Sequence, residues 1–196
     1  MLLKKRIIID IIINKYYNKK VMFMVRKAVY DDIDKIITII EDAKALLKNN
    51  HSLQWQDSDG YPNRKTVYAD IEKGWLYVNI RNNSLAGIVT LVAVADESYK
   101  KIEAGNWLNN RRYYAIHRLA VKKEFYRQGV ARELLDYTTI ITKQNGVYDL
   151  RTDTTEENSS MHCLLEKCGF IRCGIVYLVR SDCPDPKRIA FHKVLK

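Results

Sequence analysis

The sequence predicts one α/β domain in which helices cover both faces of a mixed β-sheet. Two observations support this fold class. The chain has 196 residues, 47% of them hydrophobic, with only eight Gly and three Pro, which suits one globular domain and excludes disordered and fibrous proteins. Strand-like and helix-like segments also alternate from Met24 onward, without an internal repeat or a low-complexity linker.

The first half of the domain has a clear helix and a loop-rich segment. Apolar residues at helical spacing follow the acidic start Tyr30-Asp31-Asp32, and the turn residues Asp59-Gly60 and Tyr61-Pro62 mark a loop. In chain order we expect a strand over 23–28, a helix from 30 toward 48 in one piece or two, a loop over 49–65, a helix over 67–73, and a hairpin of strands 75–80 and 85–94.

The second half alternates more regularly. Val130, Leu134 and Leu135 lie on one side of a helix that Asn145-Gly146 ends. The expected elements are a strand over 113–121, a helix over 130–143, a strand over 147–152, a helix over 159–168, and closing strands over 171–179 and 188–194. This order predicts a mixed sheet with helices on both faces.

The formal charge of +10 is unevenly distributed along the chain. Residues 1–23 hold six Lys or Arg residues against Asp10 alone, so half of the excess lies there. The apolar stretch from Ile7 to Ile13 contains this Asp and is shorter than the roughly 20 residues that span a bilayer. An over-extended reading frame, a surface tail and a membrane contact stay open for this segment. We expect an N-terminal extension over 1–23 and one domain over 24–196.

The cysteines point away from a metal site. Their spacing contains no C-x2-C pair, and no nearby His completes a zinc pattern. With no export signal, reduced thiols and a cytoplasmic location are expected. The domain itself is only mildly basic and has no recognised nucleic-acid motif, which argues against a nucleic-acid partner. The four residues are Cys163, Cys168, Cys173 and Cys183.

The stretch from Ile116 to Arg132 has the strongest chemical pattern. A strand ends at Val121, a short basic loop follows, and Gly129 precedes a long helix. Free N–H groups at the helix start and the helix dipole favour an anion there, and glycine lets the backbone approach it closely. Arg127 and Arg132 can reach a phosphate. Neither a Rossmann nor a Walker motif is present, so phosphate binding and an ordinary strand–loop–helix connection both stay open.

Two blocks of the sequence resemble the GNAT superfamily of acetyl-CoA-dependent N-acetyltransferases. The first comprises Leu119-Ala120-Val121 and the loop Arg127-Gln128-Gly129-Val130-Ala131. The second, about 30 residues later, comprises Asn158 and Leu165-Glu166-Lys167-Cys168-Gly169-Phe170. The resemblance covers Met24 to Lys196. It implies a GNAT-like, mostly antiparallel sheet of six to seven strands, and an acyltransferase that uses acetyl-CoA as co-substrate and no metal.

The resemblance also implies which residues bind the cofactor. In such proteins the loop binds the pyrophosphate through backbone amides, and the preceding strand splays from its neighbour so that its backbone pairs with the pantetheine arm. The Asn before the late helix contacts that arm as well. The implied cofactor-binding residues are Leu119, Val121, Arg127, Gln128, Gly129, Val130, Ala131, Arg132 and Asn158.

The sequence departs from the family pattern at two positions. The first loop position, usually Arg or Gln, is Tyr126, and Arg127 can supply the charge because the loop binds mainly through backbone N–H groups. Four residues before Gly169, where many members carry a Tyr that protonates the departing thiolate, stands Leu165. Leucine cannot donate a proton. Either another group does so or the thiolate leaves unassisted, which a thiol pKa near 8.5 permits.

His117 is the candidate general base. Strand alternation predicts that it shares a face with Leu119 and Val121, which the resemblance places beside the cleft. A histidine's ordinary pKa near 6.5 suits removal of a proton from an ammonium, directly or through water, and a histidine at the matching position is the base in the arylalkylamine branch. A structural imidazole is the alternative. Arg118 is expected on the opposite face, paired with a carboxylate. Three rival carboxylates are expected to be solvated loop charges: Glu103, Asp153 and Glu156.

The acceptor side is less clearly marked. The segment from Trp55 to Pro62 is similar to one in a bacterial branch of the superfamily. Its aromatic residues and Asp57 suit an amine pocket, but Trp55 could equally pin a loop to the core. Cys163 and Cys168 have apolar neighbours and are expected to fill the core.

These features lead to one functional hypothesis and one alternative. The hypothesis is transfer of acetyl from acetyl-CoA to a primary amine by direct attack in a ternary complex, with His117 as base and a strand N–H near Leu119 or Val121 polarising the carbonyl. The alternative, motivated by Leu165, is an acyl-CoA-binding module without turnover. The expected partner is a small-molecule or peptide amine, with no nucleic acid and no membrane span. The acceptor and the oligomeric state, a homodimer included, stay open.

Overall fold

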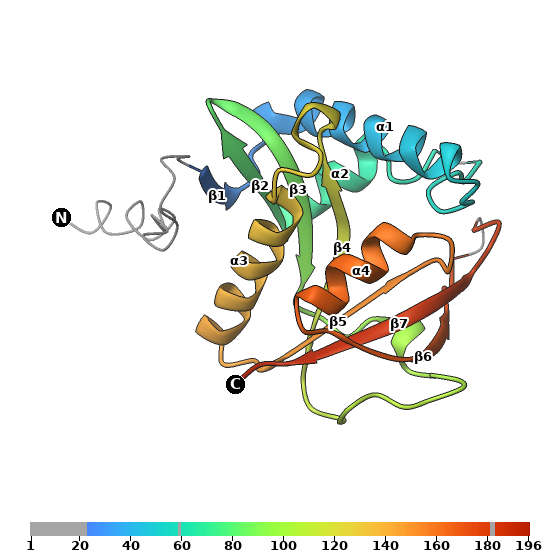
Figure 1. Ribbon diagram of the computed structural model, residues 1–196. Helices are drawn as coiled ribbons and strands as arrows, with labels where there is room; N and C mark the ends of the chain where they lie inside the picture. Colours follow the sequence, from blue (N-terminus) through green and yellow to red (C-terminus); the bar gives the residue numbers. More distant parts are fainter. Residues whose placement is uncertain (1–22, 59, 181–182) are drawn as a thin grey trace.

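The computed structural model describes residues 23–58, 60–180 and 183–196. This part of the chain forms one seven-stranded sheet in the order β1-β2-β3-β4-β5-β7-β6 (Figure 1). Only β4 and β5 are parallel neighbours, so the predicted mixed, mostly antiparallel sheet is confirmed. The strands are β1 (Phe23–Lys27), β2 (Leu76–Arg81), β3 (Ser84–Val92), β4 (Tyr114–Val121), β5 (Asp149–Thr154), β6 (Ile171–Tyr177) and β7 (Lys187–Val194).

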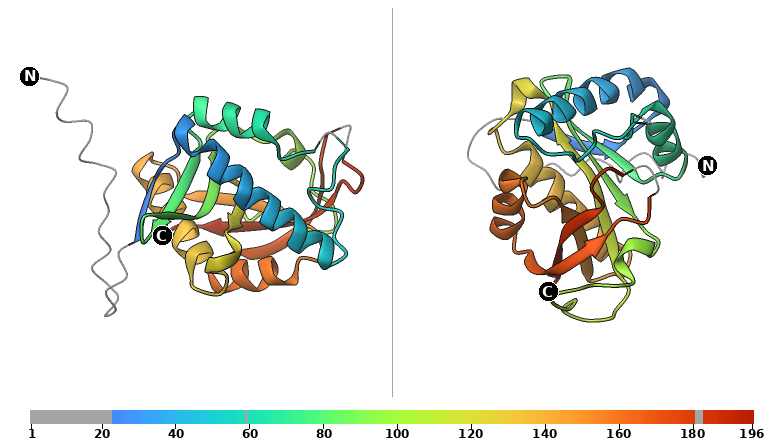
Figure 2. Two further views of the ribbon diagram at one scale, coloured as in Figure 1. Left: turned by 90° about the horizontal axis from the view of Figure 1, so that it is seen from above. Right: turned by 90° about the vertical axis from the view of Figure 1, so that its right-hand side faces the viewer.

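Two helices cover each face of the sheet (Figures 1 and 2). Ile36, Ile39 and Ile40 of α1 are fully buried in the core between α1, α2 and the sheet. Leu134 of α3 and Leu165 of α4 belong to the core on the opposite face. The helices are α1 (Ile33–Asn49), α2 (Arg64–Glu72), α3 (Val130–Gln144) and α4 (Ser159–Lys167), with 3-10 turns η1 (Tyr30–Asp32), η2 (Glu97–Tyr99) and η3 (Lys123–Phe125). The predicted helices on both faces are therefore confirmed.

Element boundaries differ from the predictions where turns and caps decide them. α2 begins three residues before the predicted Val67, because the Asn63 side chain accepts a hydrogen bond from the Thr66 N–H (3.1 Å) and caps the helix. β5 begins later than predicted, because the Val147 N–H donates to the carbonyl of Thr142 (3.1 Å) and closes the end of α3.

β4 and β5 pair over only three residues and then diverge. The paired segment joins Tyr114–Ile116 to Leu150–Thr152, and the Thr152 hydroxyl donates to the Ile116 carbonyl (2.9 Å) at its end. Beyond Ile116, β4 continues for five residues along β3 alone (Figure 1). This divergence, which the family resemblance implies, opens the sheet at its centre.

A β-bulge changes the side-chain pattern of β4. Thr90 pairs with His117 and Ile88 with Ala120, so Arg118 and Leu119 together face one residue of β3, and Arg118 has a φ of +49°. Because the extra residue resets the alternation, Leu119 packs on the α3 side whereas His117 contacts Asp96 and Tyr99 on the other. The prediction that His117 shares a face with Leu119 and Val121 is wrong for this reason.

The predicted extension over residues 1–23 lies outside the described residues, except that Phe23 is the first residue of β1. Within the described ranges, no helix is long and apolar enough to cross a bilayer.

Candidate active site

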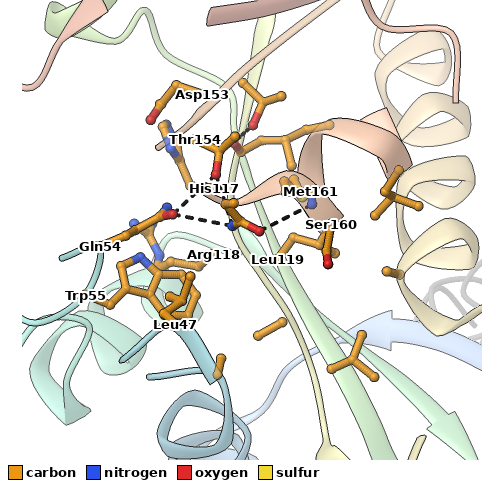
Figure 3. Close-up of a pocket in the computed structure, with 18 of the residues that line it drawn as sticks. Leu47, Gln54, Trp55, His117, Arg118, Leu119, Asp153, Thr154, Ser160 and Met161 are labelled. Carbon is orange, nitrogen blue, oxygen red and sulfur yellow. Dashed lines mark hydrogen bonds between the residues drawn. The ribbon is translucent and has the colours of Figure 1, made fainter. Parts of the chain in front are cut away.

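A pocket of about 830 Å³ occupies the space where β4 and β5 diverge. Its walls come from both halves of the molecule (Figure 3): Leu119 of β4, Thr154 of β5, Met161 of α4, and Trp55 from the loop between α1 and α2. The pocket runs from the start of α3 to the loop that follows β6. One continuous space therefore reaches the predicted phosphate loop, His117 and the predicted acceptor segment.

The start of α3, at one end of this pocket, has the features that favour an anion. Gly129 precedes the helix with a φ of +85°, and no side chain caps it. The first intrahelical bond joins the Glu133 N–H to the Gly129 carbonyl (3.0 Å), which leaves the N–H groups of the first turn free. Free donors and the positive end of the helix dipole favour a phosphate here.

Most of the predicted loop residues line the pocket at this end. Arg127 has a φ of +59° and forms no ion pair within the described ranges. Gln128 does not line the pocket, because its side-chain amide donates to the Glu124 carbonyl (2.8 Å) and it lies exposed on the outside of the loop. The predicted residues that do line it are Arg127, Gly129, Val130, Ala131 and Arg132.

The free edge of β4 leads from this end toward the centre of the pocket. The Lys122 N–H donates to the Ala86 carbonyl on the β3 side (2.8 Å). Backbone groups alternate along a strand, so those of Val121 and Leu119 point to the opposite edge, which β5 has left. Both residues line the pocket, and their backbone groups can pair with an extended amide-containing chain.

His117 and Asp96 form a hydrogen-bonded pair in the wall of the pocket. The His117 Nε2 lies 3.0 Å from Asp96 Oδ2, with the two side chains 19% and 22% exposed. Burial alone would raise the pKa of the Asp96 carboxyl, but its hydrogen bonds with His117 and the Ser98 N–H outweigh this effect and lower the pKa. Among the described residues no hydrogen bond joins Nδ1 of His117 to another group, and His117 lines the pocket. The pair therefore places an imidazole held by a carboxylate in the wall of the pocket.

Asp153 is not the solvated loop charge that the sequence predicts. It belongs to β5, its side chain is buried, and it accepts a hydrogen bond from the Tyr99 hydroxyl (2.6 Å), with Arg188 Nε 3.7 Å away. Burial and the charge of Asp153 hold the pKa of Tyr99 well above its ordinary value. Asp153 is held in this buried cluster because β5 extends two residues further than predicted. Glu103 and Glu156 form surface ion pairs, with Lys101 and with Arg172 respectively.

Trp55 lines the pocket and also packs on the core, so the predicted contact with the core is confirmed, and binding of an amine by this segment stays a prediction. The Asp57 carboxylate is buried and pairs with Arg180 (2.6 Å), whose guanidinium lies 3.6 Å from the centre of the Tyr61 ring. The Tyr61 hydroxyl accepts a hydrogen bond from Arg118 Nη1 (2.7 Å). Aromatic and charged groups therefore form this end of the wall.

Arg118 pairs with a carboxylate, as predicted, but it lies on the same face as His117. Its Nε and Nη2 donate to the two oxygens of Asp70 (2.7 and 3.0 Å), and Nε also contacts the hydroxyl of Thr90 (3.3 Å). Thr90 is the residue that pairs with His117 across the strands. The bulge at Arg118 explains why simple alternation predicts the wrong face.

Asn158 is the N-cap of α4 and lines the pocket. Its side-chain oxygen accepts from the Met161 N–H (3.3 Å), and its amide nitrogen donates to the Thr154 hydroxyl (3.1 Å). Gln54 reaches across from the α1–α2 loop, and its Oε1 accepts from Thr154 (3.2 Å) and Asn158 (3.5 Å) (Figure 3). Sequence reasoning missed Gln54, since nothing in the local pattern relates residue 54 to residue 158.

Leu165, at the position of the usual general-acid tyrosine, is fully buried in the core beside α3 and does not line the pocket. Cys168 is buried as predicted, and burial raises the pKa of its thiol. Cys163 is exposed, so the prediction that it fills the core is wrong: its position faces outward on α4. No cluster of His, Cys, Asp or Glu among the described residues could hold a metal ion.

Comparison with known proteins defines the class to which this fold and site belong. The model of the acetyltransferase (GNAT) family matches residues 40–170, more than half of the chain. A crystal structure of a GNAT-family acetyltransferase from Streptococcus agalactiae 2603 is 34% identical, with a TM-score of 0.80, and the match covers 89% of this chain and 96% of that one. The chain belongs to the GNAT acetyltransferase family.

One curated relative and one further solved structure extend this comparison. A curated Bacillus subtilis protein, the uncharacterized N-acetyltransferase YesJ, is 23% identical over 148 residues, which cover 73% of this chain and 78% of the relative. The crystal structure of the ribosomal-protein-S18-alanine N-acetyltransferase from Escherichia coli has the same fold, with a TM-score of 0.61 at 17% identity, over 89% of this chain and 95% of that one. As a family member, the protein is an acyltransferase, and N-acetyl transfer is the activity that its family supports.

Proposed function

We propose that the protein transfers the acetyl group of acetyl-CoA to a primary amine by direct attack in a ternary complex. The observation that carries this proposal is the continuity of the pocket, which joins an anion-binding helix start and a free strand edge to the His117–Asp96 pair. Such a pocket has room for a phosphorylated donor and a separate amine at the same time.

The residues present fit acetyl-CoA. The free N–H groups of Val130, Ala131 and Arg132 and the left-handed backbone at Gly129 suit the pyrophosphate, with Arg127 adding charge. The backbone groups of Leu119 and Val121 suit the amides of the pantetheine arm, with Asn158 close to the start of α4. Acetyl-CoA supplies the acetyl thioester, whose C–S bond breaks as the new C–N bond forms.

The chain's own groups handle protons and charge. His117, directly or through a water, takes the proton that the ammonium must lose before its nitrogen can attack. A backbone N–H near Leu119 or Val121 donates a hydrogen bond to the carbonyl oxygen as negative charge develops there. Of the two protons that a primary ammonium loses in forming an amide, one ends on the departing thiolate and one in solvent. No acid beside Leu165 is needed, since a thiolate with a conjugate-acid pKa near 8.5 is a tolerable leaving group.

Release of free CoA from acetyl-CoA tests the proposal, measured with spermidine, an aminoglycoside, free amino acids and short peptides as acceptors. We expect turnover with at least one class of amine. We also expect a loss of about 10²-fold or more in kcat for His117→Ala, with acetyl-CoA affinity by calorimetry within about threefold of wild type. Acetyl-CoA binding without turnover across the panel would favour the alternative, an acyl-CoA-binding module, and would overturn the proposal.

Three broader expectations belong to the same proposal. We infer that residues 24–196 are the acetyltransferase domain and that residues 1–23 lie outside it. A cytoplasmic location is supported by the four free cysteines, which are typical of a reducing compartment. The partner is expected to be a small-molecule or peptide amine, and a homodimer stays a prediction.

A further inference from the structure

We propose that Asp96 is a positioning residue for the acetyl transfer. Its carboxylate holds the His117 imidazole in the tautomer that carries hydrogen on Nε2, which leaves Nδ1 unprotonated toward the pocket. The inference rests on the proposed function, in which His117 accepts the proton of the ammonium. It goes further by naming the atom that accepts the proton and the group that selects it.

Two hydrogen bonds hold Asp96 in place independently of His117. Its Oδ1 accepts a hydrogen bond from the Ser98 N–H (2.8 Å) as the N-cap of η2, and its own N–H donates to the Tyr113 hydroxyl (3.1 Å). Oδ2 faces His117, at 3.0 Å from Nε2. An ionised carboxylate can only accept hydrogen bonds, so the nitrogen that faces it must carry the hydrogen. The other ring nitrogen is then the free acceptor.

Asp96 is also the carboxylate of this wall whose charge is not already compensated by an arginine. Asp70 is paired with Arg118, Asp57 with Arg180, and Asp153 receives the Tyr99 hydroxyl with Arg188 nearby. Two further titratable groups lie beside the His117–Asp96 pair: Tyr99, whose ring centre lies 6.1 Å from that of His117, and Tyr113, whose hydroxyl accepts from the Asp96 N–H. When His117 takes a proton, Asp96 is therefore the adjacent negative charge that stabilises the imidazolium.

The proton balance assigns each group one task. The ammonium N–H bond breaks, its electron pair stays on the amine nitrogen, and the proton moves to His117 Nδ1. Asp96 accepts no proton and keeps the Nε2–H bond oriented, as the carboxylate does in Ser-His-Asp triads. After transfer, Nδ1 returns its proton to solvent, which restores the starting tautomer.

Substitution of Asp96 by Asn tests this arrangement, because an amide has a single acceptor oxygen. In Asp96→Asn, the Ser98 N–H and the His117 ring compete for that single oxygen. If the oxygen stays with the Ser98 N–H, the amide NH2 faces Nε2 of His117, which must then accept a hydrogen bond, so the ring hydrogen moves to Nδ1. Long-range ¹H–¹⁵N NMR reports the tautomer directly, with the His117→Ala spectrum identifying the His117 signals. We expect Nε2–H in the wild-type protein and Nδ1–H in Asp96→Asn, each at a pH where the ring is neutral.

The NMR measurement needs no substrate, so its outcome is separate from that of the turnover assay. Nδ1–H in the wild-type protein, or an unchanged tautomer in Asp96→Asn, would overturn the inference and leave the proposed acetyl transfer standing. If the wild-type protein turns over no amine of the panel, the proposed function is overturned, and the tautomer result still stands.

Kinetics with any amine that turns over gives a second, independent readout. We expect Asp96→Asn to lower kcat by about 10²- to 10⁴-fold and to leave the KM for acetyl-CoA nearly unchanged. In the His117→Ala background the same substitution should cost nothing further. Glu97→Gln, at the exposed acidic residue next along the chain, is the matched control and should behave as wild type. If Asp96→Asn lowers kcat by the same factor in the wild-type and His117→Ala backgrounds, Asp96 has a structural role and the proposal is wrong.

Discussion

Gly129 stands where the backbone must adopt a left-handed conformation to present the free amides of α3, with a φ of +85°. An added Cβ would meet nothing within 4 Å, so an alanine at this position is unfavourable because of the left-handed backbone and not because of a steric clash. Left-handed backbone costs a non-glycine residue about 1–2 kcal/mol. We expect Gly129→Ala to relax the loop in the free protein and to raise the Kd for acetyl-CoA about tenfold, measured by calorimetry.

Gly146 provides the control for this prediction. It has a φ of +69° at the opposite end of α3, again with open space around an added Cβ. Gly146→Ala should lower the unfolding free energy by the same cost of left-handed backbone, about 1–2 kcal/mol, and leave the Kd for acetyl-CoA unchanged. Equal effects of the two substitutions on affinity would refute the role given to the start of α3.

His192 gives a stability prediction that is independent of the active site. It is fully buried, its Nδ1 accepts from the Leu108 N–H (3.2 Å), and its Nε2 faces Asp149 (3.0 Å). Burial lowers the pKa of His192, and the positive charges of Arg151 and Arg111 add to this, while Asp149 opposes it without reversing it. The folded protein therefore holds this ring neutral at a pH where an unfolded chain protonates it.

The sign of the pH dependence follows from this lowered pKa. Between the folded-state pKa and the unfolded value near 6.5, the unfolded state binds more protons, so stability rises with pH. The contribution is fully present above pH 6.5 and is lost as the pH falls toward the folded-state pKa, at up to about 1.4 kcal/mol per pH unit. Urea unfolding from pH 8 to pH 5 should show a steeper loss for wild type than for His192→Gln. Parallel pH profiles would contradict this account of His192.

At the scale of elements, the position of α3 depends on a close approach to β3 at Gly87. A Cβ at this position would lie 2.8 Å from Val130 Cγ1 and 2.9 Å from the carbonyl oxygen of Ala120. Gly87→Ala should therefore push the first turn of α3 outward, lower the unfolding free energy by about 1–3 kcal/mol in urea, and weaken acetyl-CoA binding.

A double substitution checks the cause of that effect. Val130→Ala removes the methyl carbon that the new Cβ would meet, so Gly87→Ala should cost less in the Val130→Ala background than in wild type. Additive costs would show that the contact between β3 and α3 is not the reason for the change.

The elements themselves were largely predictable from the sequence. Apolar spacing indicates α1 and α3 because each buries one face, and the Ile residues at 33, 36 and 40 are indeed buried. The phosphate loop was also predictable, since a strand, a basic loop, a glycine and a helix follow one another within the chain. These signals lie within short stretches of the chain, although the helices gain most of their stability from packing their apolar faces against the sheet.

The contacts that complete the site were not predictable, because they join distant positions through irregular backbone. Asp96 reaches His117 only because the chain turns back after β3, and Gln54 reaches Asn158 across the whole cleft. The bulge at Arg118 inverts the side-chain alternation of β4 without any local signal in the sequence. Such long-range contacts depend on the packed fold as a whole and produce no periodic pattern in the sequence.

At the scale of the whole molecule, the α1–α2 loop joins the two halves around the pocket. Gln54 contacts Thr154 of β5 and Asn158 at the start of α4, and Asp57 pairs with Arg180 after β6. The same pocket extends to Gly129 at the start of α3. In the proposed mechanism, a donor held at α3 and an amine held near His117 would share this one space. Direct transfer requires both substrates to be bound together, whereas a covalent acetyl-enzyme does not.

The initial-rate pattern tests this central claim most directly. Rates of CoA release are measured over a matrix of acetyl-CoA and amine concentrations, with whichever acceptor of the panel turns over. Direct attack in a ternary complex predicts that the double-reciprocal lines intersect, because both substrates must be bound together. Parallel lines, the pattern of a covalent acetyl-enzyme, or acetyl-CoA binding with no turnover by any amine of the panel, would contradict it.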